Sequence, residues 1–262
     1  MSNLAVEYIE DYYNVKNEKD LYKFNKRRKR KSQVKKQLLQ LQHINPMTSN
    51  QEAVFTSYNK GNNILLHGVA GTGKTFLSLY LALDELLNDN IDRKEKVVIV
   101  RSAVPTRDIG FLPGKETEKT AIYEQPYKAI CSEILNRGDA YDILKTKNII
   151  EFITTSYIRG ITLDDAIIIV DECQNMTFHE LDSIITRVGI NSKILLCGDF
   201  RQTDLNKPYE KSGIKQFMDI TNKMYYFDNI EFGFDDIVRS AFVKEYIMAK
   251  EKYNEIQPLQ SI

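Results

Sequence analysis

One short stretch, residues 68–75, constrains what this chain can fold into more than any other feature of its sequence. It reads GVAGTGKT and fits the pattern G-x-x-x-x-G-K-[ST], in which glycines let successive backbone N–H groups turn toward an anion. A short apolar run, NILLH, precedes it, and a helix-like run, FLSLYLALDELL, follows it. Because a helix N-terminus attracts negative charge, this order predicts a cradle for the phosphates of a nucleotide.

The members of this loop have different expected roles. Lys74 is expected to contact the β- and γ-phosphates, and the Thr75 hydroxyl is expected to ligate Mg²⁺. A glycine-rich turn of this length also arises by chance, but the flanking strand and helix favour the nucleotide site. The residues expected to bind the nucleotide in this loop are Gly68, Val69, Ala70, Gly71, Thr72, Gly73, Lys74 and Thr75.

Apolar, β-branched runs alternate with helix-like segments along the rest of the chain. Such runs are typical of parallel strands that are buried on both faces by helices. The sequence therefore predicts an α/β core with a mostly parallel central sheet flanked by helices. Strands are expected at 63–67, 96–102, 148–154, 166–172, 193–199 and 224–228, and helices at 48–61, 73–87, 118–135, 178–189 and 235–253. Ser49 and Glu52 have capping-box spacing at the start of the first helix, and Gly61 should end it.

The first 45 residues differ in composition from the core, which we place at 46–262. Lys+Arg and Asp+Glu balance at 36 each over the whole chain, but residues 22–36 are strongly basic. Such a basic N-terminal arm can contact nucleic-acid phosphates, with Tyr22 and Phe24 beside it for stacking on bases. A solvated helical face or a disordered tail explains the same charges equally well.

Two further strand ends carry polar residues that a phosphate cradle lacks by itself. The run AIIIVDECQN places Asp171 at the carboxyl edge of the sheet, where it fits as the Mg²⁺ partner, and Glu172 would polarise the attacking water. Consecutive acids also end strands and cap turns without any catalytic role. Gln202 follows the strand that ends in Gly198 and Asp199, so it either contacts the γ-phosphate or the water, or belongs to a tight turn.

Several longer motifs resemble one family, the PhoH-like P-loop ATPases, which are related to the first core domain of superfamily-one helicases. RGITLDDAIIIVDECQNMT is similar to the family's R-G-x-T-L-x-D-A block and its D-E-A-Q-N signature. RSAVPTRDIGFLPG is similar to its segment ending in G-F-L-P-G, and TRVGINSKILLCGDFRQTDL to its G-D-x-x-Q-x-D-L stretch. The resemblance covers roughly residues 46–250.

This resemblance implies a RecA-like domain that uses ATP and Mg²⁺. Gln51 stands where helicase relatives keep a glutamine that reads the adenine, although its spacing also fits a surface helix residue. Arg187 and Arg239 match family arginines, one of which would serve as an arginine finger. Because the chain has one core domain, the resemblance implies that the finger comes from a neighbouring subunit of a ring-like homo-oligomer, a hexamer. It also implies single-stranded RNA or DNA as a partner, with helicase activity less well supported.

These observations leave two main hypotheses about function. The first is an ATPase coupled to single-stranded nucleic acid; the alternative is a nucleotide-switched binding or scaffold protein with negligible turnover. A small-molecule kinase is disfavoured, because no acceptor pocket or lid is evident. The three cysteines are isolated, no apolar run reaches the roughly 20 residues of a membrane span, and the N-terminus does not resemble a signal peptide. We therefore expect a cytoplasmic protein without a membrane partner.

Overall fold

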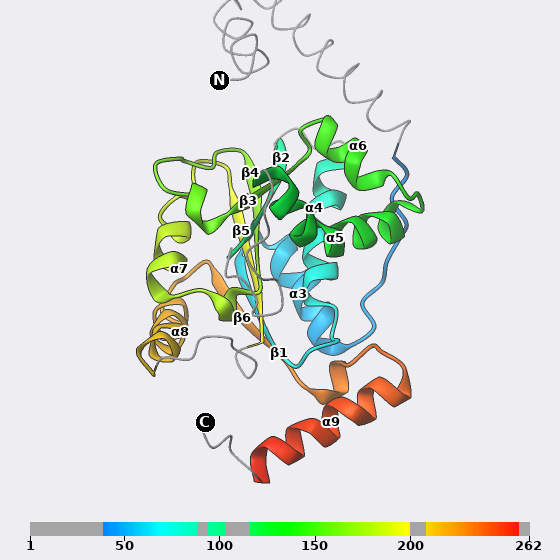
Figure 1. The fold of residues 1–262 in the computed structure, drawn as a ribbon, viewed down its shortest axis with the longest axis vertical. Helices are drawn as coiled ribbons and strands as arrows, with labels where there is room; N and C mark the ends of the chain where they lie inside the picture. Colours follow the sequence, from blue (N-terminus) through cyan, green and yellow to red (C-terminus); the bar gives the residue numbers. More distant parts are fainter. Residues whose placement is uncertain (1–38, 88–93, 103–115, 200–207, 257–262) are drawn as a thin grey trace, which may run out of the picture.

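The computed structural model describes residues 39–87, 94–102, 116–199 and 208–256. At its centre lies a six-stranded sheet with the order β3-β2-β4-β5-β1-β6, and every pair of neighbouring strands is parallel (Figure 1). The strands are β1 (Asn63–Gly68), β2 (Lys96–Arg101), β3 (Ile150–Thr154), β4 (Ala166–Asp171), β5 (Lys193–Gly198) and β6 (Phe227–Phe232). The α/β, RecA-like architecture predicted from the sequence is confirmed.

Helices cover both faces of this sheet, which explains why its central strands are apolar without interruption. One face packs against α3 (Ser49–Asn59), α4 (Lys74–Leu87), α5 (Glu116–Leu135) and α6 (Ala140–Thr146). The other packs against α7 (Phe178–Ile185) and α8 (Pro208–Thr221) (Figure 1). Side chains alternate between the two cores along each strand: Val97 and Ile99 face the first, and Val98 and Val100 the second.

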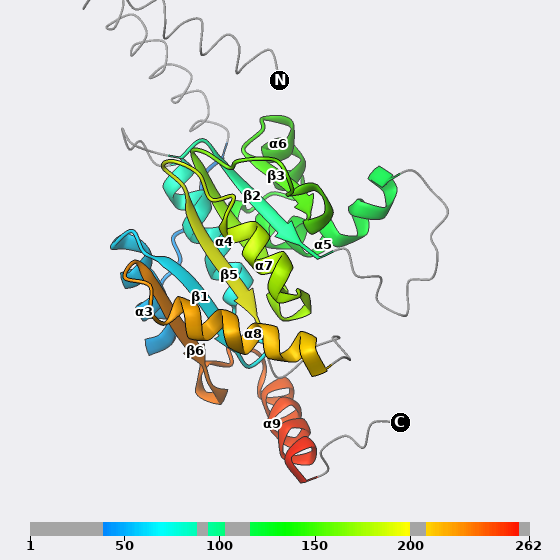
Figure 2. The same ribbon diagram turned by 90° about the vertical axis from the view of Figure 1, so that its left-hand side faces the viewer.

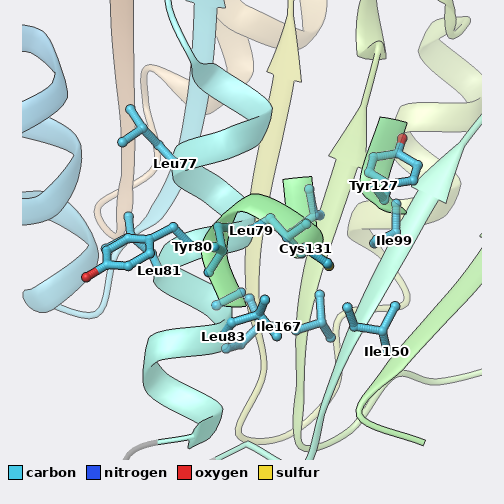
Figure 3. Close-up of a cluster of buried hydrophobic side chains, with 14 of the residues drawn as sticks. Leu77, Leu79, Tyr80, Leu81, Leu83, Ile99, Tyr127, Cys131, Ile150 and Ile167 are labelled. Atoms are coloured by element: carbon cyan, nitrogen blue, oxygen red, sulfur yellow. The ribbon is translucent and has the colours of Figure 1, made fainter. Parts of the chain in front are cut away.

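Helix α4 lies deepest in the first layer. Its buried residues run around most of its circumference, from Leu77 to Leu83, as expected for a helix enclosed on all sides. Side chains of α4 and α5 meet those of the sheet in this layer (Figure 3). Fully burying one such leucine contributes about 1.5–3 kcal/mol to the stability of the fold. Together these side chains hold α4, including its N-terminus, against the sheet.

The ends of several elements differ from the prediction. Helix α3 is capped by Thr48, whose side chain accepts from the Gln51 N–H, and not by Ser49. The last strand starts three residues later than expected, because Tyr225 and Tyr226 are 88% and 67% exposed and precede β6. That edge strand is partly polar, which hid it from a search for apolar runs. Helices α6 and α8 were not predicted.

The C-terminal helix also differs from its prediction. The segment expected to be one helix begins with a 3-10 turn (Phe234–Asp236), and α9 (Ala241–Ile256) follows after a break. Helix α9 lies beyond the carboxyl ends of the strands and projects from the rest of the molecule (Figure 2). Among the described residues, no helix combines the length and apolar character needed to cross a bilayer.

Most of the predicted N-terminal arm, residues 1–38, lies outside the described residues. The described part of it contacts the core: Leu39 is buried in the first layer, and the Gln42 N–H donates to the Ile134 carbonyl of α5 at 2.9 Å. The domain boundary near residue 45 stays a prediction. The GFLPG segment at 110–114 also lies outside the described residues.

Candidate nucleotide-binding site

The glycine-rich loop joins the end of β1 to the start of α4, as its motif requires. Gly68, Gly71 and Gly73 all have positive φ, at 116°, 79° and 86°. At Gly68 the constraint is strict, since a Cβ there would stand 2.2 Å from the Phe232 carbonyl oxygen of the neighbouring strand β6. The loop leads into α4, whose first N–H groups have no acceptor within the helix. Loop and helix therefore present backbone donors to an anion.

Lys74 is the first residue of α4, and its side chain folds back over the loop. Its Nζ donates to the carbonyl oxygens of Gly68 and Val69, both at 2.8 Å. Burial lowers the pKa of Lys74 from its ordinary value, and the Asp199 carboxylate opposes that shift. The ammonium group is therefore held at the mouth of the loop by weak neutral acceptors that a phosphate oxygen can replace.

Thr75 and Asp171 meet directly, although 96 positions separate them in the sequence. The Thr75 hydroxyl donates to Asp171 Oδ1 at 2.8 Å, and the Tyr127 hydroxyl donates to Oδ2 at 2.8 Å. Burial, followed by the nearby Glu172 charge, raises the pKa of Asp171, while these two hydrogen bonds lower it. Burial disfavours the charged form of this carboxylate, and a nearby cation would stabilise it.

This pair of oxygen groups fits Mg²⁺. In nucleotide sites Mg²⁺ is usually held by one or two carboxylates together with substrate phosphates and water. The Asp171 carboxylate and the Thr75 hydroxyl are hard oxygen donors that lie together beside the phosphate loop. Within the described ranges no group of three or more His, Cys, Asp or Glu residues is arranged to hold a metal alone.

Glu172 and Gln174 form the next part of the site. Glu172 follows β4 in the left-handed region with φ of 53°, a conformation that costs about 1–3 kcal/mol and is frequent at functional sites. The Gln174 amide donates to Glu172 Oε2, and its carbonyl oxygen accepts from the Asp199 N–H at 3.1 Å. Gln174 thus links the carboxyl ends of β4 and β5. It stands within the DECQN motif but was not selected as a site residue.

Gln51 lies behind the loop and is not a surface residue, because its side chain is only 3% exposed. Its Nε2 donates to the Thr72 carbonyl at 3.1 Å, and its Oε1 accepts from the Met47 N–H at 2.8 Å. The alternative of a surface helix position is therefore wrong. Contact with an adenine stays a prediction.

The two candidate arginines lie in different parts of the molecule. The Val238 N–H donates to the Gly71 carbonyl at 3.1 Å, and the Arg239 Cγ would be 3.1 Å from a Cβ on Gly71, so Arg239 lies beside the loop of its own chain. The backbone of Arg187 lies beside Leu163, which precedes β4, and its carbonyl accepts from the Leu163 N–H at 2.9 Å. This backbone therefore lies near the amino ends of the strands, whereas the phosphate loop lies at their carboxyl ends. Gln202 lies outside the described residues.

Tyr127 and Arg101 join the site although no sequence signal pointed to them. Tyr127 lies within α5, and Arg101 ends β2 in register with Asp171 of β4. The Arg101 guanidinium lies 5.7 Å from the centre of the Tyr123 ring on α5. Burial raises the pKa of Tyr127 well above its ordinary value, with a contribution from Asp171, so the hydroxyl stays protonated and donates.

Comparison with known proteins identifies a family and relatives to which this sequence is similar. The family model described as "PhoH-like protein" matches residues 43–251. The PhoH-like protein of Bacillus subtilis (strain 168) is 34% identical over 212 residues, which cover 80% of this chain and 65% of that protein. The PhoH-like protein of Synechocystis sp. is 32% identical over 219 residues, covering 82% of this chain and 64% of that protein. The chain therefore spans less than two thirds of the length of these relatives.

Solved structures that resemble the chain include the large terminase of a thermophilic bacteriophage. It is 15% identical, with a TM-score of 0.46 over 80% of this chain and 50% of that one. Likeness at this level has no bearing on function.

Proposed function

Since this chain belongs to the PhoH-like protein family, we propose that it binds ATP with Mg²⁺ and hydrolyses the bond between the β- and γ-phosphates. The observation that carries the proposal is the convergence of four side chains at one edge of the sheet. Lys74 and Thr75 come from the loop and α4, and Asp171 and Glu172 from the end of β4. The contact between Thr75 and Asp171, at 2.8 Å, joins the two parts.

In the proposed binding step, the phosphates lie against the loop N–H groups and the N-terminus of α4. Lys74 exchanges its bonds to the Gly68 and Val69 carbonyls for bonds to phosphate oxygens, which are charged and therefore stronger acceptors. Thr75 and Asp171 hold Mg²⁺. When bound, the ion neutralises charge that develops on the β- and γ-phosphate oxygens.

In the proposed chemical step, Glu172 orients a water molecule and takes its proton. The water oxygen forms a bond to the γ-phosphorus, the bond to the β–γ bridging oxygen breaks, and ADP leaves with the electron pair. Gln174 supports Glu172 through its amide, and the same side chain contacts the backbone of Asp199. We assign Gln202, which follows Asp199 in the sequence, to contact with the γ-phosphate or the water.

Further parts of the proposal concern the base and the partners. Gln51 is already fixed at the back of the loop by its bond to Thr72, and we assign it to the adenine side of the site. Arg239, beside Gly71, is the arginine that the same chain can supply. Single-stranded RNA or DNA and a ring-like homo-oligomer, a hexamer, are the proposed partners, as the resemblance of the sequence motifs implies.

The decisive experiment measures phosphate release and ATP binding by the purified protein, with and without single-stranded RNA and DNA. We expect Glu172→Gln to keep Mg²⁺-dependent ATP binding and to lose turnover by about 10²–10⁴-fold, the usual contribution of a general base. Lys74→Ala provides the blank. Glu151→Gln provides a matched control, since Glu151 is an exposed residue of β3 whose side chain pairs with Lys96 at 2.7 Å.

Three outcomes separate the hypotheses. Turnover that rises with added strands and disappears in Glu172→Gln supports the ATPase coupled to nucleic acid. Turnover in Glu172→Gln equal to that of the wild type would refute the assigned role of Glu172. ATP binding without measurable hydrolysis, with or without strands, would favour a nucleotide-switched binding protein.

A further inference from the structure

We propose that Tyr127 is a positioning residue for the Mg²⁺ site, which fixes the Asp171 carboxylate in the orientation that binds the cation. This inference rests on the proposed function, since it concerns the carboxylate assigned to Mg²⁺. Tyr127 itself is not a ligand in this proposal. It acts through Asp171, from a helix that is separate from both the phosphate loop and β4.

The two oxygens of Asp171 each have a different protein donor. Oδ1 accepts from Thr75 on α4, and Oδ2 accepts from Tyr127 on α5, both at 2.8 Å. Two bonds to opposite oxygens fix the rotation of the carboxylate about its last torsion, which a single bond does not. Groups that hydrogen-bond to metal ligands in this way typically change metal affinity by 10–100-fold when they are removed.

The Tyr127 hydroxyl is held in place independently of Asp171. Its ring is 1% exposed and packs at 6.0 Å, centre to centre, on the Phe152 ring. Figure 3 shows the ring among the core side chains, with its hydroxyl oxygen directed toward the carboxyl ends of the strands. The Tyr127 side chain therefore loses little further conformational entropy when its hydroxyl donates to the Asp171 carboxylate.

Helix α5 has its own anchor one turn before Tyr127. Glu124 is 4% exposed and accepts from the Tyr141 hydroxyl of α6 at 2.7 Å and from Lys145 Nζ at 2.6 and 2.8 Å. This second network ties α5 to α6 and does not involve Asp171. Because Lys145 pairs with Glu124 as well as Tyr141 does, α5 stays tied to α6 when the Tyr141 hydroxyl alone is removed.

The bond from Tyr127 has an ordinary structural explanation as well, because a buried tyrosine hydroxyl needs an acceptor. The two explanations differ in what they predict for the metal. If Asp171 only satisfies Tyr127, removing the hydroxyl changes stability and leaves cation affinity unaltered. If Tyr127 positions Asp171, the same change weakens cation binding even when the fold is intact.

The test is Tyr127→Phe, which removes the hydroxyl and keeps the ring that packs on Phe152. A fluorescent ADP analogue is titrated in EDTA and then at increasing Mg²⁺, and Mn²⁺ binding is followed separately by electron paramagnetic resonance. We expect nucleotide affinity in EDTA to stay within about twofold of the wild type. The Mg²⁺ and Mn²⁺ midpoints should rise by about 10-fold.

Tyr141→Phe is the matched control, because it also removes a buried hydroxyl that donates to a carboxylate, at 2.7 Å from Glu124. Thermal unfolding in EDTA shows whether both variants are folded and similarly destabilised. A rise in the cation midpoints for Tyr127→Phe but not for Tyr141→Phe supports the proposal.

Two results would overturn the inference in distinguishable ways. If Tyr127→Phe binds the analogue with the cation midpoint of the wild type, the positioning role is wrong and the proposed ATPase function stands. If the wild type binds no nucleotide at any Mg²⁺ concentration, the proposed function fails, and the role of Tyr127 fails with it.

Discussion

Replacing Gly68 by alanine should destabilise the protein far more than the same change at two other glycines. Gly68 has φ of 116°, and an alanine Cβ would stand 2.2 Å from the Phe232 oxygen and 2.9 Å from its nitrogen. Both are backbone atoms of β6, and the Phe232 carbonyl also accepts from the Val69 N–H at 3.0 Å. Backbone strain costs about 1–3 kcal/mol, and displacing packed atoms costs about 1–3 kcal/mol more. We therefore expect a loss of about 2–6 kcal/mol.

Two controls separate these contributions. Gly61 has φ of 86° but nothing within 4 Å of its added Cβ, so Gly61→Ala introduces strain without a clash and should cost about 1–2 kcal/mol. At Gly138 the added Cβ also meets nothing, and φ lies outside the left-handed region. Gly138→Ala should be neutral or stabilise by about 0.4–1 kcal/mol, since alanine restricts the unfolded chain.

Urea unfolding followed by far-UV circular dichroism measures the three variants. An unchanged m value would show that the differences reflect stability and not the compactness of the unfolded state. If Gly68→Ala costs no more stability than Gly61→Ala, the close contact between the loop and β6 is not as rigid as the distances indicate, and the reasoning is refuted.

Two other predictions concern the site and the response to acid. Gln174→Leu removes the link between Glu172 and the Asp199 backbone. Phosphate release should therefore fall by about 10-fold or more, while ATP affinity measured in EDTA should not change. Phosphate release at the rate of the wild type would contradict this prediction. Asp228 accepts from Ser57 and Asn62 at 2.6 and 2.9 Å, which lowers its pKa. A carboxyl whose pKa falls on folding stabilises the protein above its unfolded value of about 3.9 and loses that contribution as the pH falls through the folded pKa. Asp228→Asn should therefore lower the unfolding free energy at neutral pH and flatten its decline below about pH 4; parallel pH profiles would contradict this.

The fold was predictable where local pattern and tertiary packing agree. Strands β1, β2, β4 and β5 are buried on both faces, so each is a continuous apolar run that stands out in the sequence. The edge strand β6 was misplaced, because four of its six residues are partly buried or exposed and the preceding pair Tyr225 and Tyr226 looked more like a strand. Helix α8 has a mixed composition and gave no clear signal.

Of the residues that the structure brings together beside the loop, only those within one motif could be selected from the sequence. Lys74, Thr75, Asp171 and Glu172 were selected because a loop and a strand end carry them in recognisable patterns. Tyr127 was not, because it reaches the site from the middle of a helix whose position depends on the packing of α5 on the sheet and α6. A side chain that contacts such a residue from a distant helix leaves no spacing rule in the sequence, so three-dimensional contacts are needed to find it.

The positions of the two arginines bear on the proposed ring. Arg187 lies before the amino end of β4, and the six residues of that strand span about 20 Å at roughly 3.3 Å each. The loop lies at the other end of the sheet, so in the proposed ring a finger at Arg187 would act on the nucleotide of another copy. Arg239 lies beside Gly71 of its own loop and needs no second copy. A finger at Arg187 therefore makes turnover depend on assembly, whereas one at Arg239 lets a single chain hydrolyse ATP.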